Sequence, residues 1–199
     1  IGLADILEMQ ASGELNERQL FYVQEIRNSG EWLSTMVTHI LDYTALLAGR
    51  VTVRPQRCRL IELAAGAMQQ IQSQAVARRL KLKLTATPHD LEIVSDNACI
   101  SQVLERLLDN AAKFTPDGGS IGVDVNLDDI GHLVHVVVWD TGIGIASDQQ
   151  EAIFRPFEQV DHGLDRQYTG AGLGLAYVLQ MVKLLGGSIA VQSALGEGS

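Results

Sequence analysis

The stretch "SIGVDVNLDDIGHLVHVVVWD", residues 120–140, contains the two clearest strand patterns of the chain. Residues 120–127 and 132–140 read as strands, and the turn-rich "DDIG" joins them as neighbours in a hairpin. Helical patterns lie on both sides, at residues 97–113 and 172–185. A hairpin set among helices predicts a mostly antiparallel sheet with helices on one face, which is an α+β domain.

The neighbouring segments fit the same class. Periodicity and β-branched content predict a helix over residues 60–79, a short helix over 149–153, and strands at "LKLKLTA" (80–86), "LEIVS" (91–95) and "GSIAVQS" (187–193).

The N-terminal part has a different character. A helical pattern over residues 1–10 breaks at Ser12-Gly13, and Asn16 then serves as an N-cap with Gln19 as its capping-box partner. A second helix runs from there to Ala48 and ends at Gly49. Its apolar stripe consists of Leu33, Met36, Val37, Ile40, Leu41, Thr44 and Leu47. Two helices cannot enclose a core alone, so we expect a homodimer through this hairpin, forming a four-helix bundle.

The totals restrict the class of protein. The 199 residues are 46% hydrophobic, enough to bury a core, and the formal net charge is −9, which disfavours nucleic-acid binding. Cys58 and Cys99 form no CxxC pair, which is typical of a reduced, cytoplasmic compartment. No apolar run approaches the roughly 20 residues that span a bilayer. We therefore expect a cytoplasmic location and no membrane contact by this segment, although upstream segments could anchor the protein.

Both chain ends predict a piece of a longer protein. "IGLADILEMQ" starts in helical periodicity without an N-cap, and "LGEGS" ends in a turn. The expected division is a partial dimerisation hairpin at 1–50 and a second domain at 51–199, with the boundary near residues 49–58.

The stretch "RLLDNAAKFTPDGG" places three polar side chains on one helix face. Arg106, Asn110 and Lys113 follow one another at four and three residues. An amide oxygen can ligate Mg²⁺, and a Lys one turn further can neutralise phosphate charge. By itself the pattern also fits a solvated helix face.

The stretch "WDTGIGIA" ends an apolar strand in a carboxylate. Asp140 can accept a hydrogen bond from an exocyclic amine such as adenine N6, where guanine presents an acceptor, and Gly142 and Gly144 follow. The alternative is an Asp that caps a turn.

The stretch "IFRPFEQVDHGLDRQYTGAGLGLAYV" reads as a loop between two hinges. Phe154 and Phe157 form an apolar anchor, Arg166 lies in the polar middle, and Gly170, Gly172 and Gly174 precede a helix N-terminus that favours phosphate. The glycines fit neither the phosphate-loop nor the dinucleotide pattern. An ordinary surface loop is the alternative.

Taken together and in this order, the motifs resemble the catalytic core of sensor histidine kinases over the whole chain. "DNAAKFT" resembles the N box, "DTGIG" the first glycine box, "IFRPF" the phenylalanine box, and "GAGLGL" the second glycine box. "GEGS" looks like the start of the third, and the hairpin through "LLAGRVTV" looks like the end of the dimerisation domain. The form "PFEQVD…R…GLGL" is similar to kinases of the hybrid type.

The resemblance implies a fold and a set of site residues. The fold is a helical hairpin followed by an α/β sandwich ATP-binding domain of the histidine kinase/gyrase-like superfamily, with Mg-ATP as cofactor. Asn110 would coordinate Mg²⁺, Lys113 would contact the phosphates, and Phe114 would lie near adenine. Asp140 would bind adenine N6, and Gly142 and Gly144 would give backbone clearance. The implied lid residues are Arg166, Thr169, Gly170, Gly172, Leu173, Gly174 and Leu175, with Phe154 and Phe157 as its anchor.

Three features depart from the family pattern. Arg106 stands where a second Asn is usual, and it cannot ligate a cation, although it could contact phosphate. The phosphoacceptor His is expected upstream of Ile1, and His39 lies in the wrong helix with no acidic residue directly after it. The last strand of the sheet is expected beyond the third glycine box and is missing.

Arg106 also bears on reaction type. Related ATPases place a Glu there to activate water, and arginine cannot act as a general base. Glu105 lies about 100° around the helix, so hydrolytic ATPase activity is disfavoured.

Two functions remain. In the first, the parent protein is a protein-histidine kinase that transfers the ATP γ-phosphoryl to a histidine and then to an aspartate of a response regulator receiver domain, a phosphorelay of two-component signalling. In the second, motivated by Arg106, a degenerate kinase serves as a nucleotide-independent dimeric scaffold or phosphatase module. The signal, the cognate regulator and cis or trans transfer are not encoded in these motifs.

Overall fold

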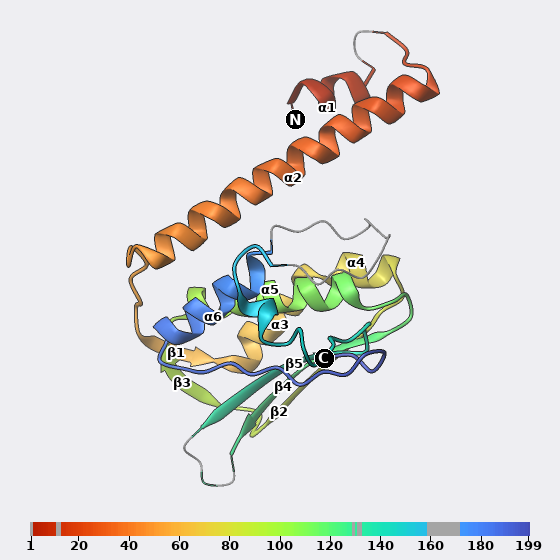
Figure 1. Cartoon of the computed structure of the whole chain (residues 1–199). Helices are drawn as coiled ribbons and strands as arrows, with labels where there is room; N and C mark the ends of the chain where they lie inside the picture. The colour runs from red at the N-terminus through yellow and green to blue at the C-terminus, as the bar shows by residue number, and fades with distance from the viewer. Residues whose placement is uncertain (1, 11–12, 129, 131–132, 159–171) are drawn as a thin grey trace. The chain divides into compact units, whose positions relative to one another are not determined.

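The computed structural model describes residues 2–10, 13–128, 130, 133–158 and 172–199. The chain divides into two compact units, Ile1–Thr44 and Ala45–Ser199, which are described separately (Figure 1). Within the described residues, no helix is long and apolar enough to cross a membrane.

The first unit is a helical hairpin. Helices α1 (Gly2–Glu8) and α2 (Glu17–Leu47) form it, and Arg27 Nε lies 3.3 Å from a carboxylate oxygen of Glu8 across the pair. The predicted capping box is confirmed, since the Asn16 side chain accepts the Gln19 N–H at 2.9 Å and the Gln19 side chain accepts the Asn16 N–H at 3.0 Å. The turn that ends α2 has Gly49 at a φ of 65°, which favours glycine.

The second unit contains a three-stranded sheet and a smaller two-stranded one. The three-stranded sheet has the order β2-β4-β5, with β2 parallel to β4 and β4 antiparallel to β5. The predicted β4–β5 hairpin is therefore confirmed, whereas the parallel β2–β4 pair makes the sheet mixed. The strands are β1 (Gln56–Arg59), β2 (Lys81–Thr87), β3 (Glu92–Ser95), β4 (Ser120–Leu127) and β5 (Val134–Asp140).

Alternation along β4 determines which face of the sheet carries the core. Ile121, Val123 and Val125 are fully buried, while Gly122 and Asp124 point to the opposite face. On that face the Trp139 ring lies against Gly122, where a Cβ would clash with it, and Trp139 Nε1 donates to Asp124 at 2.8 Å. The helices cover the other face (Figure 1). They are α3 (Leu60–Gln70), α4 (Gln72–Ala77), α5 (Asn97–Phe114), α6 (Gly174–Leu184) and the 3₁₀ turn η1 (Ala152–Phe154).

Two sequence predictions of elements are wrong. The helix predicted over 60–79 is two helices, because the chain breaks at Ile71, which lets apolar side chains of both α3 and α4 reach the core. Residues 187–193 form no strand. At the end of this segment, Ser193 Oγ accepts the N–H of Ile145 at 2.8 Å, and Gln150 Nε2 donates to the Ser193 carbonyl at 2.8 Å.

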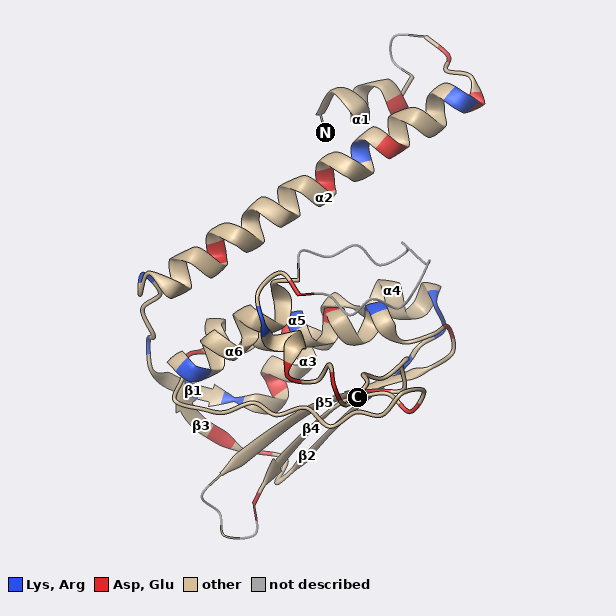
Figure 2. Cartoon of the chain, in the orientation of Figure 1, with Lys and Arg blue, Asp and Glu red and all other residues tan. Residues whose placement is uncertain are grey.

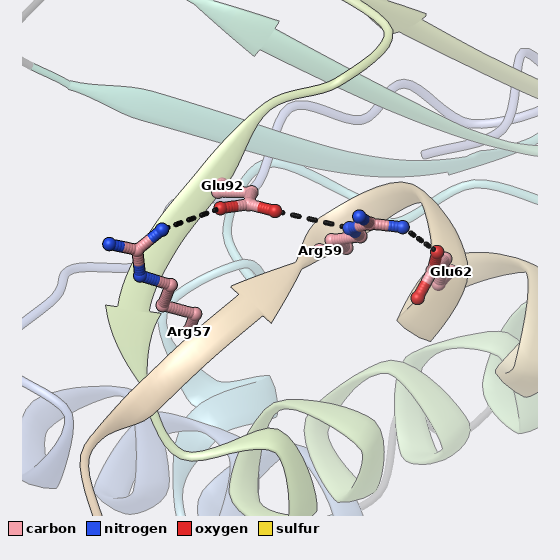
Figure 3. Close-up of polar contacts among 4 residues, drawn as sticks. All are labelled: Arg57, Arg59, Glu62 and Glu92. Carbon is pink, nitrogen blue, oxygen red and sulfur yellow. Dashed lines mark hydrogen bonds and ion pairs between the residues drawn. The ribbon is translucent and has the colours of Figure 1, made fainter.

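The two-stranded sheet carries an ion-pair chain. Antiparallel strands β1 and β3 place Glu92 between Arg57 and Arg59, and Arg59 also reaches Glu62 at the start of α3 (Figure 3). The hydrogen bonds to Glu62 and then to Glu92 raise the pKa of Arg59. Because these side chains are solvent-exposed, these ion pairs add little to the stability of the fold.

Candidate functional site

Helix α5 carries the central polar residues and is fixed at both ends. At its start, the Asp96 carboxylate accepts the backbone N–H groups of Arg54 at 2.7 Å and Cys99 at 3.1 Å, and these bonds lower the pKa of Asp96. At its end, the Arg78 guanidinium donates to the carbonyl oxygens of Ala112 at 2.5 Å and Thr115 at 2.7 Å. These caps satisfy backbone groups that a helix leaves unpaired, so the position of α5 is well determined.

The last turns of α5 present Asn110, Lys113 and Phe114, all half-buried. Lys113 Nζ lies over the Phe114 ring, 5.2 Å from its centroid. Burial lowers the pKa of Lys113, and the charge of Asp109 opposes that shift. A partly desolvated ammonium gains more from an anionic ligand than an exposed one does.

The turn after β5 joins Asp140 to the end of α5. Asp140 Oδ1 accepts the Gly142 N–H at 2.7 Å, and the Phe114 carbonyl accepts the Ile143 N–H at 3.3 Å. A Cβ at Gly142 would lie 2.5 Å from Asp140 Oδ1 and 2.6 Å from the Phe114 oxygen, so this position requires glycine.

The Asp140 carboxylate is half-buried, and burial raises its pKa while the Gly142 hydrogen bond opposes the shift. The Gly142 bond occupies one carboxylate oxygen, and the other is the acceptor that a ligand amine would need.

The C-terminal residues support the same turn from the other side. Asp140 and Ser199 exchange two backbone hydrogen bonds of 2.9 and 3.2 Å. Gly144 has a φ of 67°, and a Cβ there would overlap the carbonyl oxygen of Ala194. The first and third glycine stretches are therefore packed against each other, which explains why both need glycine.

The second glycine stretch begins α6 beside α5. A Cβ at Gly174 would lie 3.7 Å from Asn110 Nδ2, so the first turn of α6 faces that side chain. Gly172 has a φ of 65°, and its carbonyl accepts the Phe157 N–H at 2.9 Å. Phe154 is half-buried, but the Phe157 ring is 62% exposed, so Phe157 joins the glycine stretch through its backbone.

The structure thus brings together most of the predicted site residues. Phe114, Asp140 and Gly142 meet at the C-terminal end of α5, and Asn110 meets Gly174 one turn earlier. Leu173 is buried and Leu175 half-buried at the α6 start. Arg166, Thr169 and Gly170, with the expected lid, lie outside the described residues.

Two residues at the site have roles that the sequence did not indicate. Arg78, 35 residues before Lys113, caps the helix end that carries it. Tyr177 of α6 is buried, and its ring lies under the Arg106 guanidinium with 4.1 Å between Cζ and the ring centroid. The sequence around Arg78 and around Tyr177 contains no signal that would indicate these contacts with residues far away along the chain.

The arrangement can bind a nucleotide. It offers a carboxylate acceptor for a base amine, an amide for Mg²⁺, an ammonium for phosphate, and the N-terminus of α6. No group of three or more His, Cys, Asp or Glu residues suited to a metal occurs in the described part of the chain. Figure 2 shows acidic and basic positions interspersed along the helices of the second unit, Ala45–Ser199.

Comparison with known proteins agrees with this reading. The family model described as histidine kinase-, DNA gyrase B-, and HSP90-like ATPase matches residues 95–199. An uncharacterized sensor-like histidine kinase of Rhizobium meliloti is 36% identical over 200 residues, which cover 100% of this chain and 38% of that protein. The circadian input-output histidine kinase CikA of Synechococcus elongatus is 36% identical over 201 residues, covering 100% and 26%. The chain thus spans well under half of these relatives.

Solved structures share the architecture. The crystal structure of full-length ShkA in complex with AMPPNP superimposes with a TM-score of 0.79 at 28% identity, covering 99% of this chain and 41% of that one. The mycobacterial sensor histidine kinase MprB gives a TM-score of 0.60 at 27% identity, covering 70% and 85%.

Proposed function

The chain belongs to the histidine kinase-, DNA gyrase B- and HSP90-like ATPases as a sensor histidine kinase catalytic core, and we propose on this basis that it binds Mg-ATP between α5, the Asp140 turn and α6. The observation that carries the proposal is the meeting of Asp140, Gly142 and Phe114 beside the Asn110–Gly174 contact.

Each residue has a defined role in that site. The second carboxylate oxygen of Asp140 accepts from adenine N6, and the lack of a Cβ at Gly142 allows the close approach of Asp140 and Phe114. Asn110 would ligate Mg²⁺ through its amide oxygen, and Lys113 would pair with phosphate oxygens. Gly172, Leu173, Gly174 and Leu175 lead into α6 at the phosphate end of the site. The phosphate and lid roles expected for Arg166, Thr169 and Gly170 fall outside the described residues. When bound, Mg²⁺ would neutralise phosphate charge during phosphoryl transfer.

The reaction we propose is transfer of the γ-phosphoryl group to a histidine expected upstream of Ile1, and from there to a receiver-domain aspartate of a response regulator. Positioning and charge neutralisation supply most of the catalysis in such transfers. The α1–α2 hairpin serves as part of a homodimeric bundle. This fits α2, where Leu33, Val37 and Leu41 are 56%, 48% and 61% exposed in the single chain.

The test is incubation of the full-length protein with γ-labelled ATP and Mg²⁺. We expect a label that is stable in base and lost in acid, as phosphohistidine is, and that moves to a purified receiver domain. A full-length protein that takes no label would contradict the kinase. Absence of nucleotide binding, or binding that is indifferent to Mg²⁺, would favour the second candidate, a nucleotide-independent dimeric scaffold or phosphatase module. That candidate is motivated by Arg106, which replaces a residue type able to ligate the metal.

A further inference from the structure

The Asp96 carboxylate holds two segments of the second unit at one point. Its Oδ1 accepts the N–H of Cys99 at 3.1 Å, which caps α5, and its Oδ2 accepts the N–H of Arg54 at 2.7 Å. Asp96 is only 6% exposed, so its charge depends on these protein donors more than on water. Hydrogen bonds to a charged carboxylate are among the strong ones in proteins. The Arg54–Asp96 bond is therefore a firm attachment of the incoming chain to the start of α5.

The chain that precedes Arg54 is fixed at its other end by the cap of α2. The N–H groups of Gly49 and Arg50 donate to carbonyl oxygens in the last turn of that helix at 3.1 and 3.0 Å. Residues 51–53, which we call the connector, lie between the two fixed points. Within the described part of the chain, the connector makes no hydrogen bond and belongs to no helix or strand. The path of its backbone is consequently determined at its two ends.

Loss of the Arg54–Asp96 bond would lengthen the unattached stretch. Pro55 has no N–H to donate, and the next residue that is held is Gln56, the first residue of β1. The unattached stretch would then run over residues 51–55. At roughly 3.3–3.6 Å per residue, the two added residues give about 7 Å of additional reach. The bond at Asp96 therefore determines where the chain that comes from α2 joins the second unit.

We propose that Asp96 is a positioning residue for phosphoryl transfer, because its bond to Arg54 fixes the point at which the connector joins the ATP-binding unit. This rests on the proposed transfer from ATP to a histidine. In that transfer an imidazole nitrogen forms a bond to the γ-phosphorus, the bond from the γ-phosphorus to the bridging oxygen breaks, and ADP leaves with the electron pair. A misplacement of about 1 Å between reacting groups can cost about 100-fold in rate.

The role differs from that of a nucleotide-binding residue. Asn110 lies fourteen residues after Asp96, about 21 Å further along the axis of α5. Asp96 is thus too far from the proposed site to contact the nucleotide. Its bond to Arg54 should affect the rate of phosphoryl transfer and leave the affinity for nucleotide unchanged.

The experiment measures single-turnover phosphorylation of the full-length protein with γ-labelled ATP and Mg²⁺, and the ADP affinity of the same samples. Two variants break the bond from its two sides. Arg54→Pro removes the N–H donor and leaves the Asp96 cap of α5, whereas Asp96→Ser keeps one oxygen for that cap and loses the second acceptor. Arg54→Ala is the matched control, because it removes the same exposed side chain and keeps the N–H. Thermal melting confirms that each variant is folded.

We expect Arg54→Pro and Asp96→Ser to slow phosphorylation by more than threefold and up to about 100-fold. Lengthening a flexible tether from three to five residues would lower the effective concentration only about twofold, so a larger loss indicates positioning. Arg54→Ala should match the wild type, and every variant should bind ADP within about twofold of it. The double variant should be no slower than the slower single variant, because both changes remove the same bond.

Amide hydrogen exchange reports on the bond itself. The Arg54 N–H should exchange slowly in the wild type and at least about 10-fold faster in Asp96→Ser, because the substitution removes its acceptor. Equally fast exchange in the two proteins would show that the bond is not maintained in solution and would overturn the inference.

The kinetic results can also overturn it. A loss of threefold or less in Arg54→Pro, a faster rate, or a loss of ADP affinity as large as the loss of rate would remove the positioning role and leave the proposed transfer intact. Losses that multiply in the double variant would do the same. A wild-type protein that takes no label would overturn the proposed transfer itself and this inference with it.

Discussion

Replacing Asp140 by Asn tests the base-binding end of the site with almost no change of shape. Asp140 Oδ1 accepts the Gly142 N–H at 2.7 Å, and an Asn can keep that bond through its own oxygen. The remaining atom then changes from a carboxylate oxygen to an NH₂ group. An amine of adenine would therefore meet a donor instead of an acceptor, whereas guanine O6 would meet a suitable donor.

The magnitude follows from the type of bond. A hydrogen bond to a charged group contributes about 1.5–3 kcal/mol, which corresponds to roughly 10- to 150-fold in affinity. We expect Asp140→Asn to bind ADP at least roughly 10-fold more weakly than the wild type, and to lose much less affinity for GDP. The preference for adenine over guanine should fall accordingly.

The same substitution should not weaken the fold. Burial raises the pKa of Asp140, so the charged carboxylate is less favourable in the folded than in the unfolded chain. The associated stability is present at acidic pH and lost as the pH rises through the raised pKa. At pH 7 the neutral Asn avoids this cost, and the free energy of unfolding should equal or exceed that of the wild type.

The assay is competition of ADP and GDP against a fluorescent nucleotide at pH 7, with urea unfolding of the same samples. Asp148→Asn is the matched control, because it makes the same charge change at an exposed position. Unchanged ADP affinity in Asp140→Asn, or equal losses for ADP and GDP, would refute the role given to Asp140.

Three further tests, which use four substitutions, examine the supports of the site and the hairpin. Gly144→Ala should destabilise the protein by more than about 1–2 kcal/mol in urea, because strain at positive φ is joined by overlap with the Ala194 carbonyl. Gly118→Ala, at a φ of 81° with nothing within 4 Å, should show the backbone strain alone, and equal costs would contradict the packing described. Asn16→Ala should cost about 1 kcal/mol of helix stability and speed amide exchange in the first turn of α2; an unchanged exchange rate would argue against the capping box. Asp96→Ala should lower the free energy of unfolding by about 1–2 kcal/mol at pH 7. Because the Arg54 and Cys99 N–H groups lower the pKa of Asp96, the stability difference between wild type and variant should shrink as the pH falls below the ordinary carboxyl range. A stability difference that does not change with pH would contradict this explanation.

The sequence alone was sufficient to predict those helices and strands whose pattern is contained in a short local window. The β4–β5 hairpin, the capping box at Asn16 and the helix over 97–113 follow from alternation, turn chemistry and a 3.6-residue period, and all three are present. The break between α3 and α4 at Ile71 could not be predicted locally, since no Pro or Gly marks it and both helices pack apolar side chains on the core. The β-like composition of "GSIAVQS" produced no strand, because strand propensity depends on context, and its last residue, Ser193, is bonded to Ile145 and Gln150 instead.

The same distinction between local and long-range information applies to the candidate site. Asn110, Lys113 and Asp140 could be selected by chemistry and spacing, since their motifs are contiguous. The pairing of Arg106 with Tyr177, 71 residues later, and the capping of α5 by Arg78 depend on how the helices pack, which no local window contains. The roles of the residues in nucleotide binding, and the dimeric hairpin, stay predictions.

The most direct test of the ATP site is an amide-resolved NMR titration of the chain with a non-hydrolysable ATP analogue and Mg²⁺. We predict that the largest shifts fall on the amides of residues 110–114, 140–144 and 172–175, the three segments that meet around Asn110 and Asp140. Saturating analogue that shifts none of these amides, or only amides of α2 and the β1–β3 sheet, would contradict the account.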